Sequence, residues 1–321
     1  MKFAAVYTPR RNWPKWDWVA DAIQSRGHNL VKVHAAEELL AADSWADAVL
    51  FEHRDCGIGR RYVRDVHQKR QSLWVQWWWD LIAVDAAKSL SEQLLIEQCG
   101  EVMRCMDVVL VKERGYLPAY GRLGINAAYM DQACPSWFPQ IAHPQSPVFD
   151  VLMFGQSKER RTQVAAALVR AQLSSVWATS DPVPAGVVPL PWCHPDNLPS
   201  LMSQAVCTLS MNVRGDVDGY CSDRDWLIRG CGAVEVQGET PEQVVEAVRR
   251  VKALSASERA TLGAEARQRT MQGNTYEDRI DAIVKLVEGF RCGTSLQNLQ
   301  RDEDGCQPAQ RACKETAVSG V

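Results

Sequence analysis

The chain has 321 residues, which suits two domains of ordinary size. Hydrophobic residues make up 46% of it, charged residues 23%, and the formal net charge is -3, so the chain is globular and does not bind polyanions through its overall charge. Eleven cysteines occur without a CxxC pair, which argues against a zinc site or a disulfide framework and favours reduced thiols in the cytoplasm. The first apolar run leads directly into charged residues, so we expect no signal peptide, and no run is long enough to span a membrane.

In the first 140 residues, short apolar runs alternate with helical patterns. Runs rich in β-branched and aromatic residues predict strands at 2–8, 30–34, 46–53, 72–79 and 107–112. The intervening periodicity predicts helices at 18–26, up to about 46, through 68 and at about 90–105. Strands that alternate with helices predict a parallel sheet with helices on both faces.

A proline-rich stretch, 132–148, separates this half from a second strand–helix series. The second series predicts strands at 149–155, 174–179, 185–191, 205–212 and 232–237. Helices are predicted through 173, at 195–204, within 221–232, from 241 onward and at about 276–290. We divide the chain into a first domain (1–140), a linker (141–149), a second domain (150–291) and an aperiodic, disordered tail (292–321).

Four pieces of the second half occur in the order typical of one enzyme family. They are 150–155 with Arg160 and Arg161 shortly after, 195–202, 222–232 and 274–279. With these pieces the second half resembles the group 1 glycosyltransferases, in particular their spore-maturation-protein-like branch, which is common in bacteria and phages. The first half resembles that family only in layout. The resemblance implies an α/β protein of the GT-B fold, with two Rossmann-like, doubly wound parallel-sheet domains facing a cleft.

The loops that follow the strands of the second domain form the predicted donor site. Ligands bind open α/β sheets at the carboxyl ends of the strands, where Gly155 would let the backbone approach a diphosphate. Arg224 would neutralise the charge that develops on the leaving diphosphate. Together with the resemblance, this assigns donor binding to Gly155, Arg161, Asn212, Tyr220, Ser222, Arg224 and Asp225. From the residues alone, a simple turn glycine and a surface arginine stay open as alternatives.

The sequence departs from the family at one donor position. Where family members carry a Glu that grips the donor ribose, this chain has Leu227, for which Asp225 or Glu235 could substitute. Asp216 and Asp218 fit the DxD pattern of metal-dependent transferases, but two other pairs in the chain fit it too. The resemblance implies a nucleotide-sugar donor, and we expect a UDP-sugar. Because the DxD pattern arises so easily in this chain, we expect no metal and no further cofactor.

The loops that follow the strands of the first domain are basic and aromatic. Residues 53–70 carry six basic and two acidic side chains, and residues 10–15 add three basic ones. A basic rim with interleaved tryptophans suits nucleic acid. It assigns acceptor binding to Arg10, Arg11, Trp13, Lys15, Arg60, Arg61 and Trp77. The alternative is that the tryptophans are core residues and the arginines line a solvated helix face.

Catalysis in an inverting enzyme needs a base beside the acceptor hydroxyl. Asp80 and His53, with Arg224 at the donor, are the predicted catalytic residues, and Asp131 is a third candidate base. A helix N-cap is an equal interpretation of Asp80, and a retaining enzyme needs no such base.

We expect the protein to transfer a sugar to a hydroxymethylated base, such as 5-hydroxymethylcytosine, in double-stranded DNA. Two alternatives stay open. One is a glycosyltransferase that modifies polysaccharide or protein, and the other is a non-catalytic module that binds nucleotide or DNA.

Overall fold

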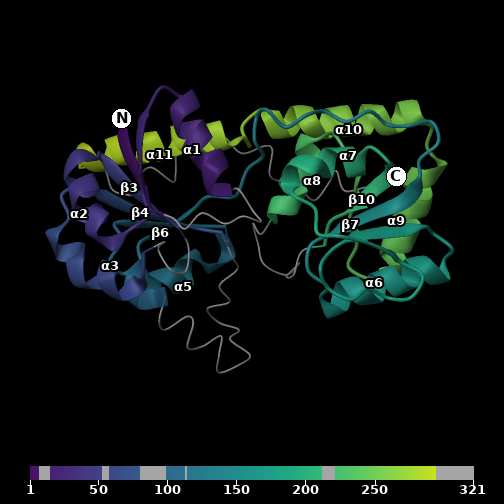
Figure 1. The fold of residues 1–321 in the computed structure, drawn as a ribbon, viewed down its shortest axis with the longest axis horizontal. Helices are drawn as coiled ribbons and strands as arrows, with labels where there is room; N and C mark the ends of the chain where they lie inside the picture. The colour runs from purple at the N-terminus through teal and green to yellow at the C-terminus, as the bar shows by residue number, and fades with distance from the viewer. Residues whose placement is uncertain (7–14, 53–57, 80–98, 113, 212–220, 294–321) are drawn as a thin grey trace. The chain divides into compact units, whose positions relative to one another are not determined.

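The computed structural model describes residues 1–6, 15–52, 58–79, 99–112, 114–211 and 221–293 (Figure 1). These residues form two compact units. Unit 1 comprises the described residues up to 132 together with Cys221 and 276–293, and unit 2 comprises 133–211 and 222–275. The final helix therefore belongs to unit 1, although it follows unit 2 in the sequence.

Unit 1 is built on a six-stranded parallel sheet with the strand order β2-β1-β3-β4-β5-β6. The strands are β1 (Lys2–Val6), β2 (Asn29–Val33), β3 (Ala48–Glu52), β4 (Leu73–Trp78), β5 (Val108–Val111) and β6 (Ala127–Tyr129). The central strands β3, β4 and β5 are almost entirely buried, which is the usual pattern for a parallel sheet covered on both faces.

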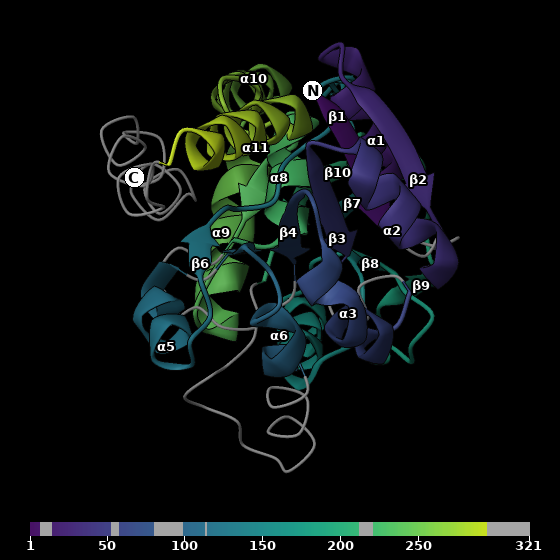
Figure 2. The same ribbon diagram turned by 90° about the vertical axis from the view of Figure 1, so that its left-hand side faces the viewer.

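Two layers of helices cover this sheet. One face packs against α2 (Ala36–Trp45), α3 (Arg60–Val66), the segment 99–106 and α5 (Leu117–Arg122), which share one hydrophobic core with it. The other face carries α1 (Lys15–Ser25) and α11 (Tyr276–Arg291), which lie side by side in Figures 1 and 2. Arg26, just after α1, joins the two helices through an ion pair of 2.9 Å with Asp281. Short 3-10 turns at His67–Lys69 (η1) and Arg114–Tyr116 (η2) complete the unit.

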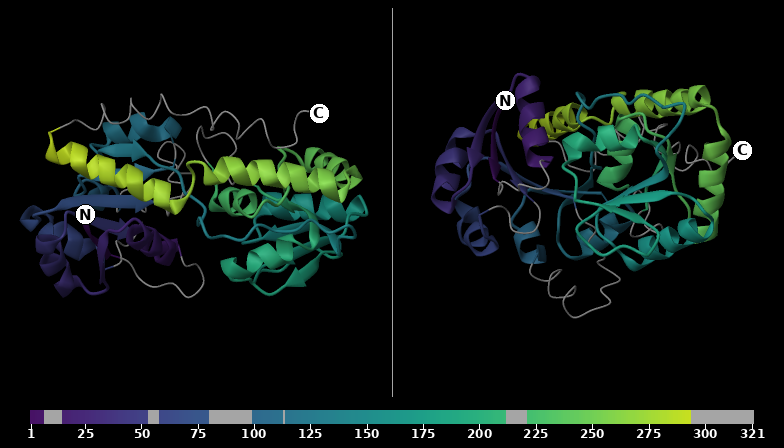
Figure 3. Two further views of the ribbon diagram at one scale, coloured as in Figure 1. Left: turned by 90° about the horizontal axis from the view of Figure 1, so that it is seen from above. Right: turned by 45° about the vertical axis from the view of Figure 1, so that its right-hand side comes forward.

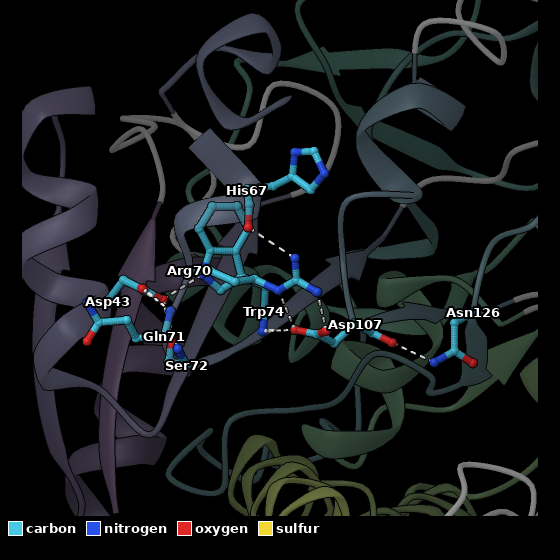
Figure 4. Close-up of polar contacts among 8 residues, drawn as sticks. All are labelled: Asp43, His67, Arg70, Gln71, Ser72, Trp74, Asp107 and Asn126. Atoms are coloured by element: carbon cyan, nitrogen blue, oxygen red, sulfur yellow. Dashed lines mark hydrogen bonds and ion pairs between the residues drawn. The ribbon is translucent and has the colours of Figure 1, made fainter. Parts of the chain in front are cut away.

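The carboxylates of Asp43, which is buried, and Asp107, which is partly exposed, fix the start of β4 (Figure 4). Asp43 of α2 accepts hydrogen bonds from the Ser72 backbone N at 3.3 Å and from the Trp74 indole N at 2.7 Å. Asp107 accepts two hydrogen bonds from the Arg70 guanidinium, at 2.7 and 3.2 Å, and one from the Trp74 backbone N at 2.8 Å. The register of β4 is therefore anchored at its amino end.

Unit 2 contains a five-stranded parallel sheet with the order β11-β10-β7-β8-β9. Its strands are β7 (Phe149–Phe154), β8 (Ser175–Ala178), β9 (Val188–Leu190), β10 (Ala205–Leu209) and β11 (Glu235–Val236). Its helices are α6 (Glu159–Arg170), α7 (Leu198–Met202) preceded by the turn η3 (Pro195–Asn197), α8 (Asp223–Gly230), α9 (Pro241–Ala253) and α10 (Ala256–Met271). Helices α6 and α9 share a hydrophobic core with the sheet.

Local sequence signals start the long helices of unit 2. The Thr240 hydroxyl accepts a hydrogen bond from the Gln243 backbone N at the start of α9, and Ser255 does the same for Glu258 at the start of α10. Helix α10 packs along α8 (Figure 3) and approaches the turn between α8 and β11 so closely that Gly263 lies against the Gly232 carbonyl.

The two parallel sheets expected from the sequence are confirmed. Helices α5 and α10 and strand β6 had no counterpart among the expected elements. The helix expected at about 90–105 is seen only as 99–103, and the expected tail lies almost wholly outside the described residues. None of the helices in the described part of the chain is both long and apolar enough to cross a membrane.

Candidate functional site

Gly155 lies directly after β7, at the carboxyl edge of the unit 2 sheet. Its φ angle of +90° is in the left-handed region, which an L side chain rarely adopts. A Cβ atom at this position would lie 3.2 Å from Nη1 of Arg224 and 3.6 Å from Nη1 of Arg161. The absence of a side chain therefore lets two guanidinium groups approach the end of one strand.

Arg161, in the first turn of α6, holds two strand-end loops together. Its side chain is 7% exposed, and it donates hydrogen bonds to the Gln156 carbonyl at 2.8 Å and to the Met211 carbonyl at 3.2 Å. These carbonyls belong to the loops after β7 and β10. Arg161 thus holds these two loops in place at the carboxyl edge of the unit 2 sheet and adds positive charge there.

Arg224, in the first turn of α8, is the second cation at this edge. It is half-buried, and its Nε has no hydrogen-bond partner among the residues that the structure describes. Two arginines beside an open strand end and the N-terminus of the 12-residue helix α6 form an environment that favours an anion. Gly155, Arg161 and Arg224, all expected at the donor, are brought together here.

Asp225 and Ser222 have a different position from the one expected of donor contacts. The Asp225 side chain is fully buried and accepts hydrogen bonds from the Ser222 backbone N at 2.8 Å and from the Ser210 hydroxyl. Ser222 is buried as well. The two residues hold the start of α8 against the end of β10, and so position Arg224 rather than face a ligand.

Leu227 and Glu235, which the sequence analysis considered for ribose binding, are both occupied by contacts within unit 2. Leu227 is fully buried in the core. Glu235 pairs with Arg229, whose Nε lies 2.5 Å from Oε2, while Gln237 donates to Oε1 at 2.6 Å. Burial raises the pKa of Glu235 to about 7, and the Arg229 guanidinium opposes this rise. Both carboxylate oxygens of Glu235 are therefore occupied within unit 2.

Several predicted site residues lie outside the described residues. These are Arg10, Arg11, Trp13, His53, Asp80, Asn212, Asp216, Asp218 and Tyr220. Among the residues that are described, no group of three His, Cys, Asp or Glu side chains is arranged to hold a metal ion.

Trp77 is not the exposed acceptor contact that the sequence suggested. Its side chain is 1% exposed and packs against Trp79 and Tyr276, with ring centroids 5.6 and 6.1 Å away. Trp77 therefore lies on the face of the sheet that α11 covers, and this packing buries it. Lys15 lies at the carboxyl edge of unit 1, where its Nζ is 5.4 Å from the Trp79 ring centroid and 3.4 Å from Oε1 of Gln132.

Arg60 and Arg61 begin α3, close to the carboxyl edge of the same sheet. The Arg61 side chain is 88% exposed, whereas Nη1 of Arg60 lies 3.8 Å from Sγ of Cys99. Asp131, the third candidate base, is buried and accepts hydrogen bonds from the Gln132 backbone N at 2.7 Å and from the Tyr129 hydroxyl at 3.4 Å.

The sequence analysis missed two buried charged residues at this edge. Glu52 ends β3 and Lys112 follows β5, and both side chains are buried. Burial also raises the pKa of the neighbouring Tyr129, and the Asp131 carboxylate adds to this rise. The available signal was a charged residue at the end of an otherwise apolar run, as Glu52 and Lys112 both are.

The two parallel-sheet α/β units define a GT-B fold. Solved structures agree. The DNA modifying enzyme β-glucosyltransferase, studied with its substrate uridine diphosphoglucose, has a TM-score of 0.63 at 14% identity over 89% of this chain and 99% of its own. The structure of T4 phage β-glucosyltransferase with UDP and Mn²⁺ has a TM-score of 0.59 at 12% identity, and the match covers 89% of this chain and 99% of the other.

A more distant enzyme shares the same fold. The α,α-trehalose 6-phosphate synthase from Burkholderia multivorans has a TM-score of 0.56 at 10% identity, over 91% of this chain and 97% of its own. No family model matches the chain, and no curated protein matches its sequence. At these identities the likeness establishes the fold.

Proposed function

We propose that the protein is a glycosyltransferase that takes a sugar from a UDP-sugar bound by unit 2. The observation that carries this proposal is the meeting of Gly155, Arg161 and Arg224 at the end of β7. The similar solved structures supply the choice of donor, because the β-glucosyltransferase is described with uridine diphosphoglucose as its substrate.

The proposed chemical role of unit 2 is to stabilise the negative charge that develops on the leaving diphosphate. When the bond between the sugar and the diphosphate breaks, negative charge develops on the leaving oxygen, and preorganised positive groups stabilise it. Arg224 is suited to this task, because Asp225 fixes its helix and its Nε has no other hydrogen-bond partner within the described residues. Arg161 keeps the surrounding loops in place. Asn212 and Tyr220 complete the proposed donor contacts.

For the acceptor we propose the hydroxyl of a hydroxymethylated base, such as 5-hydroxymethylcytosine, in double-stranded DNA. The β-glucosyltransferase to which the fold is similar is a DNA modifying enzyme. Basic residues beside the carboxyl edge of unit 1, such as the exposed Arg61, suit the DNA backbone. The base would have to leave the stack to reach the sugar. We propose Arg10, Arg11, Trp13, Lys15 and Arg60 as further acceptor contacts.

The acceptor hydroxyl needs a proton acceptor if the enzyme inverts configuration. Asp80 and His53 are the proposed bases. Asp131 is less suited, because its buried carboxylate already accepts the Gln132 and Tyr129 hydrogen bonds. We place the reaction in the cytoplasm, in keeping with the free thiols of the eight cysteines that the structure describes.

The direct test is sugar transfer from radiolabelled UDP-glucose to duplex DNA. We expect label in DNA that contains 5-hydroxymethylcytosine and none in an otherwise identical unmodified duplex. A panel of other nucleotide-sugars identifies the donor. Transfer to a polysaccharide or protein acceptor, with none to DNA, would overturn the DNA acceptor and keep the glycosyltransferase.

One observation favours a second candidate, a nucleotide-binding module without turnover. Leu227 is fully buried at the position where family members carry a ribose-binding Glu. This candidate predicts that UDP binds, as measured by calorimetry, while neither transfer nor hydrolysis of any UDP-sugar is detected.

A further inference from the structure

A basic surface on unit 1 extends well beyond the residues used above. It is formed by α3, η1, the segment 99–104 and α5, and we call it the basic face. Its positive side chains are Arg60, Arg61, Arg64, Lys69, Arg104 and Arg122. We propose that the basic face binds the phosphate backbone of duplex DNA that flanks the acceptor base, an inference that rests on the proposed DNA acceptor.

The elements of the basic face are held side by side by contacts between them. Nη1 of Arg64 on α3 lies 2.7 Å from Oε2 of Glu101, and Nε of Arg104 donates to the Leu123 carbonyl at the end of α5 at 2.7 Å. Beneath them, α3, 99–106 and α5 share one hydrophobic core. Figure 1 shows α3 and α5 on the same side of unit 1. The positive side chains therefore belong to one continuous surface.

The charge of this surface is concentrated. The basic face carries six basic residues and only two acidic ones, Asp65 and Glu101. Helices α1 and α11, on the other face of the same sheet, carry four basic and six acidic residues. Because the whole chain has a net charge of -3, a polyanion would be attracted to the basic face and not to the molecule at large.

The ion pairs on the basic face leave its arginines available to phosphate. Arg61 is 3.9 Å from Asp65 and 88% exposed, and the Arg64 side chain is 46% exposed despite its contact with Glu101. Exposed ion pairs of this kind contribute little to stability, so a phosphate can replace the carboxylate as the partner of the arginine.

The position of the basic face suits DNA that presents a base to the acceptor site. Helix α3 starts after β3, at the carboxyl edge of the unit 1 sheet, with Arg60 and Arg61 in its first turn. Arg64 and Lys69 continue the positive charge along the same segment. A duplex whose target base lies at that edge would have neighbouring phosphates along this line, where contacts fix orientation without reading sequence.

The test compares two triple variants of the full chain with equal loss of charge. Arg61→Ala, Arg104→Ala and Arg122→Ala together remove three charges from the basic face. The control combines Arg170→Ala, Arg249→Ala and Lys285→Ala, which are exposed residues of α6, α9 and α11. Affinity for an unmodified duplex is measured by fluorescence anisotropy from about 50 to 300 mM salt, the range over which phosphate contacts change affinity strongly. Circular dichroism verifies that both variants fold.

We expect the basic-face variant to weaken binding of every duplex and to flatten the log–log salt dependence by about 2 to 3 units, at roughly 0.9 per lost contact. The control should bind like the wild type. Equal slopes for the wild type and the basic-face variant would overturn the proposal. If the triple variant does not fold, Arg61→Glu alone must still weaken binding, since this side chain is 88% exposed.

UDP-glucose binding, measured on the same proteins, separates this proposal from the proposed function. It should be unchanged in the basic-face variant, because the donor residues lie in unit 2. If the wild type binds UDP-glucose but no DNA, the proposal that the basic face binds DNA is wrong, while the proposed donor site is retained. DNA binding through the basic face without UDP-sugar binding would overturn the glycosyltransferase instead.

Discussion

Arg224 is the residue on which the proposed donor site depends most. It combines a half-buried guanidinium, a first-turn position on α8 and a distance of 3.2 Å from a Cβ atom built on Gly155. We expect Arg224→Ala to lower the rate of sugar transfer by about 10²–10³, the usual cost of losing one charge-stabilising group. The measurement is transfer from labelled UDP-glucose.

The control for this variant is Arg170→Ala, which removes the same charge from the exposed end of α6 and should retain wild-type transfer. The two variants should have equal melting temperatures. A folded Arg224 variant with unchanged turnover would remove this residue from the site.

Glu235 should give unit 2 a measurable pH dependence. Burial raises the pKa of its carboxyl from 4.5 to about 7, so between these pH values the folded chain holds a proton that the unfolded chain releases. The stabilisation from this proton is complete below pH 4.5 and is lost as the pH rises towards about 7. We expect the melting temperature to fall across this window.

Glu235→Gln isolates this contribution, because glutamine does not titrate. We expect the melting temperature of the variant to change less between pH 5 and 7 than that of the wild type, the window set by the raised pKa. Above about pH 7 the variant should be less stable than the wild type, since Arg229 then lacks the anionic partner that ionised Glu235 provides. Glu239→Gln, at an exposed position nearby, is the control. Parallel pH profiles for the wild type and the Glu235 variant would contradict the assignment.

At the scale of elements, the packing of α10 determines how α8 is held. A Cβ atom on Gly263 would lie 1.9 Å from the Gly232 carbonyl oxygen and 2.8 Å from Nε2 of His143. Because a backbone atom cannot yield as a flexible side chain does, we expect Gly263→Ala to destabilise the protein by about 1–3 kcal/mol, or more if α10 is displaced. Thermal or urea unfolding measures this.

Gly121 offers a matched control on a helix of unit 1. A Cβ atom there would have nothing within 4 Å, so Gly121→Ala should be neutral or stabilise by up to about 1 kcal/mol through helix propensity. Equal stability of the two alanine variants would show that α10 shifts without cost.

At the scale of the whole molecule, metal dependence separates two ways of handling phosphate charge. One similar structure holds UDP with Mn²⁺. In this chain, Arg161, Arg224 and the α6 N-terminus supply positive charge at the end of β7. We therefore expect transfer to continue nearly unchanged in EDTA, with EDTA saturated by Mg²⁺ as the control. Loss of activity that Mn²⁺ restores would contradict this and point to Asp216 and Asp218.

The sequence by itself determined most of the elements and the class of fold, although α5, β6 and α10 were not predicted. Alternation of apolar strands with helices is a local pattern, and it correctly indicated two parallel sheets. The start of α9 was equally readable, because the Thr240 cap acts on the backbone within its own first turn. Gly155, Arg161 and Arg224 could be proposed as one site, since strands of a parallel sheet end at the same edge.

Only the tertiary structure decided which way individual side chains point. Asp225 and Arg224 are neighbours in one turn, yet the first is fully buried against Ser210 and the second approaches Gly155. The burial of Trp77 could not be predicted from the alternation of residues along β4. Helices cover both faces of a parallel sheet, so side chains on either face are buried and alternation does not distinguish buried from exposed positions. Local pattern determines an element, whereas the environment of a side chain depends on partners that are distant in the sequence.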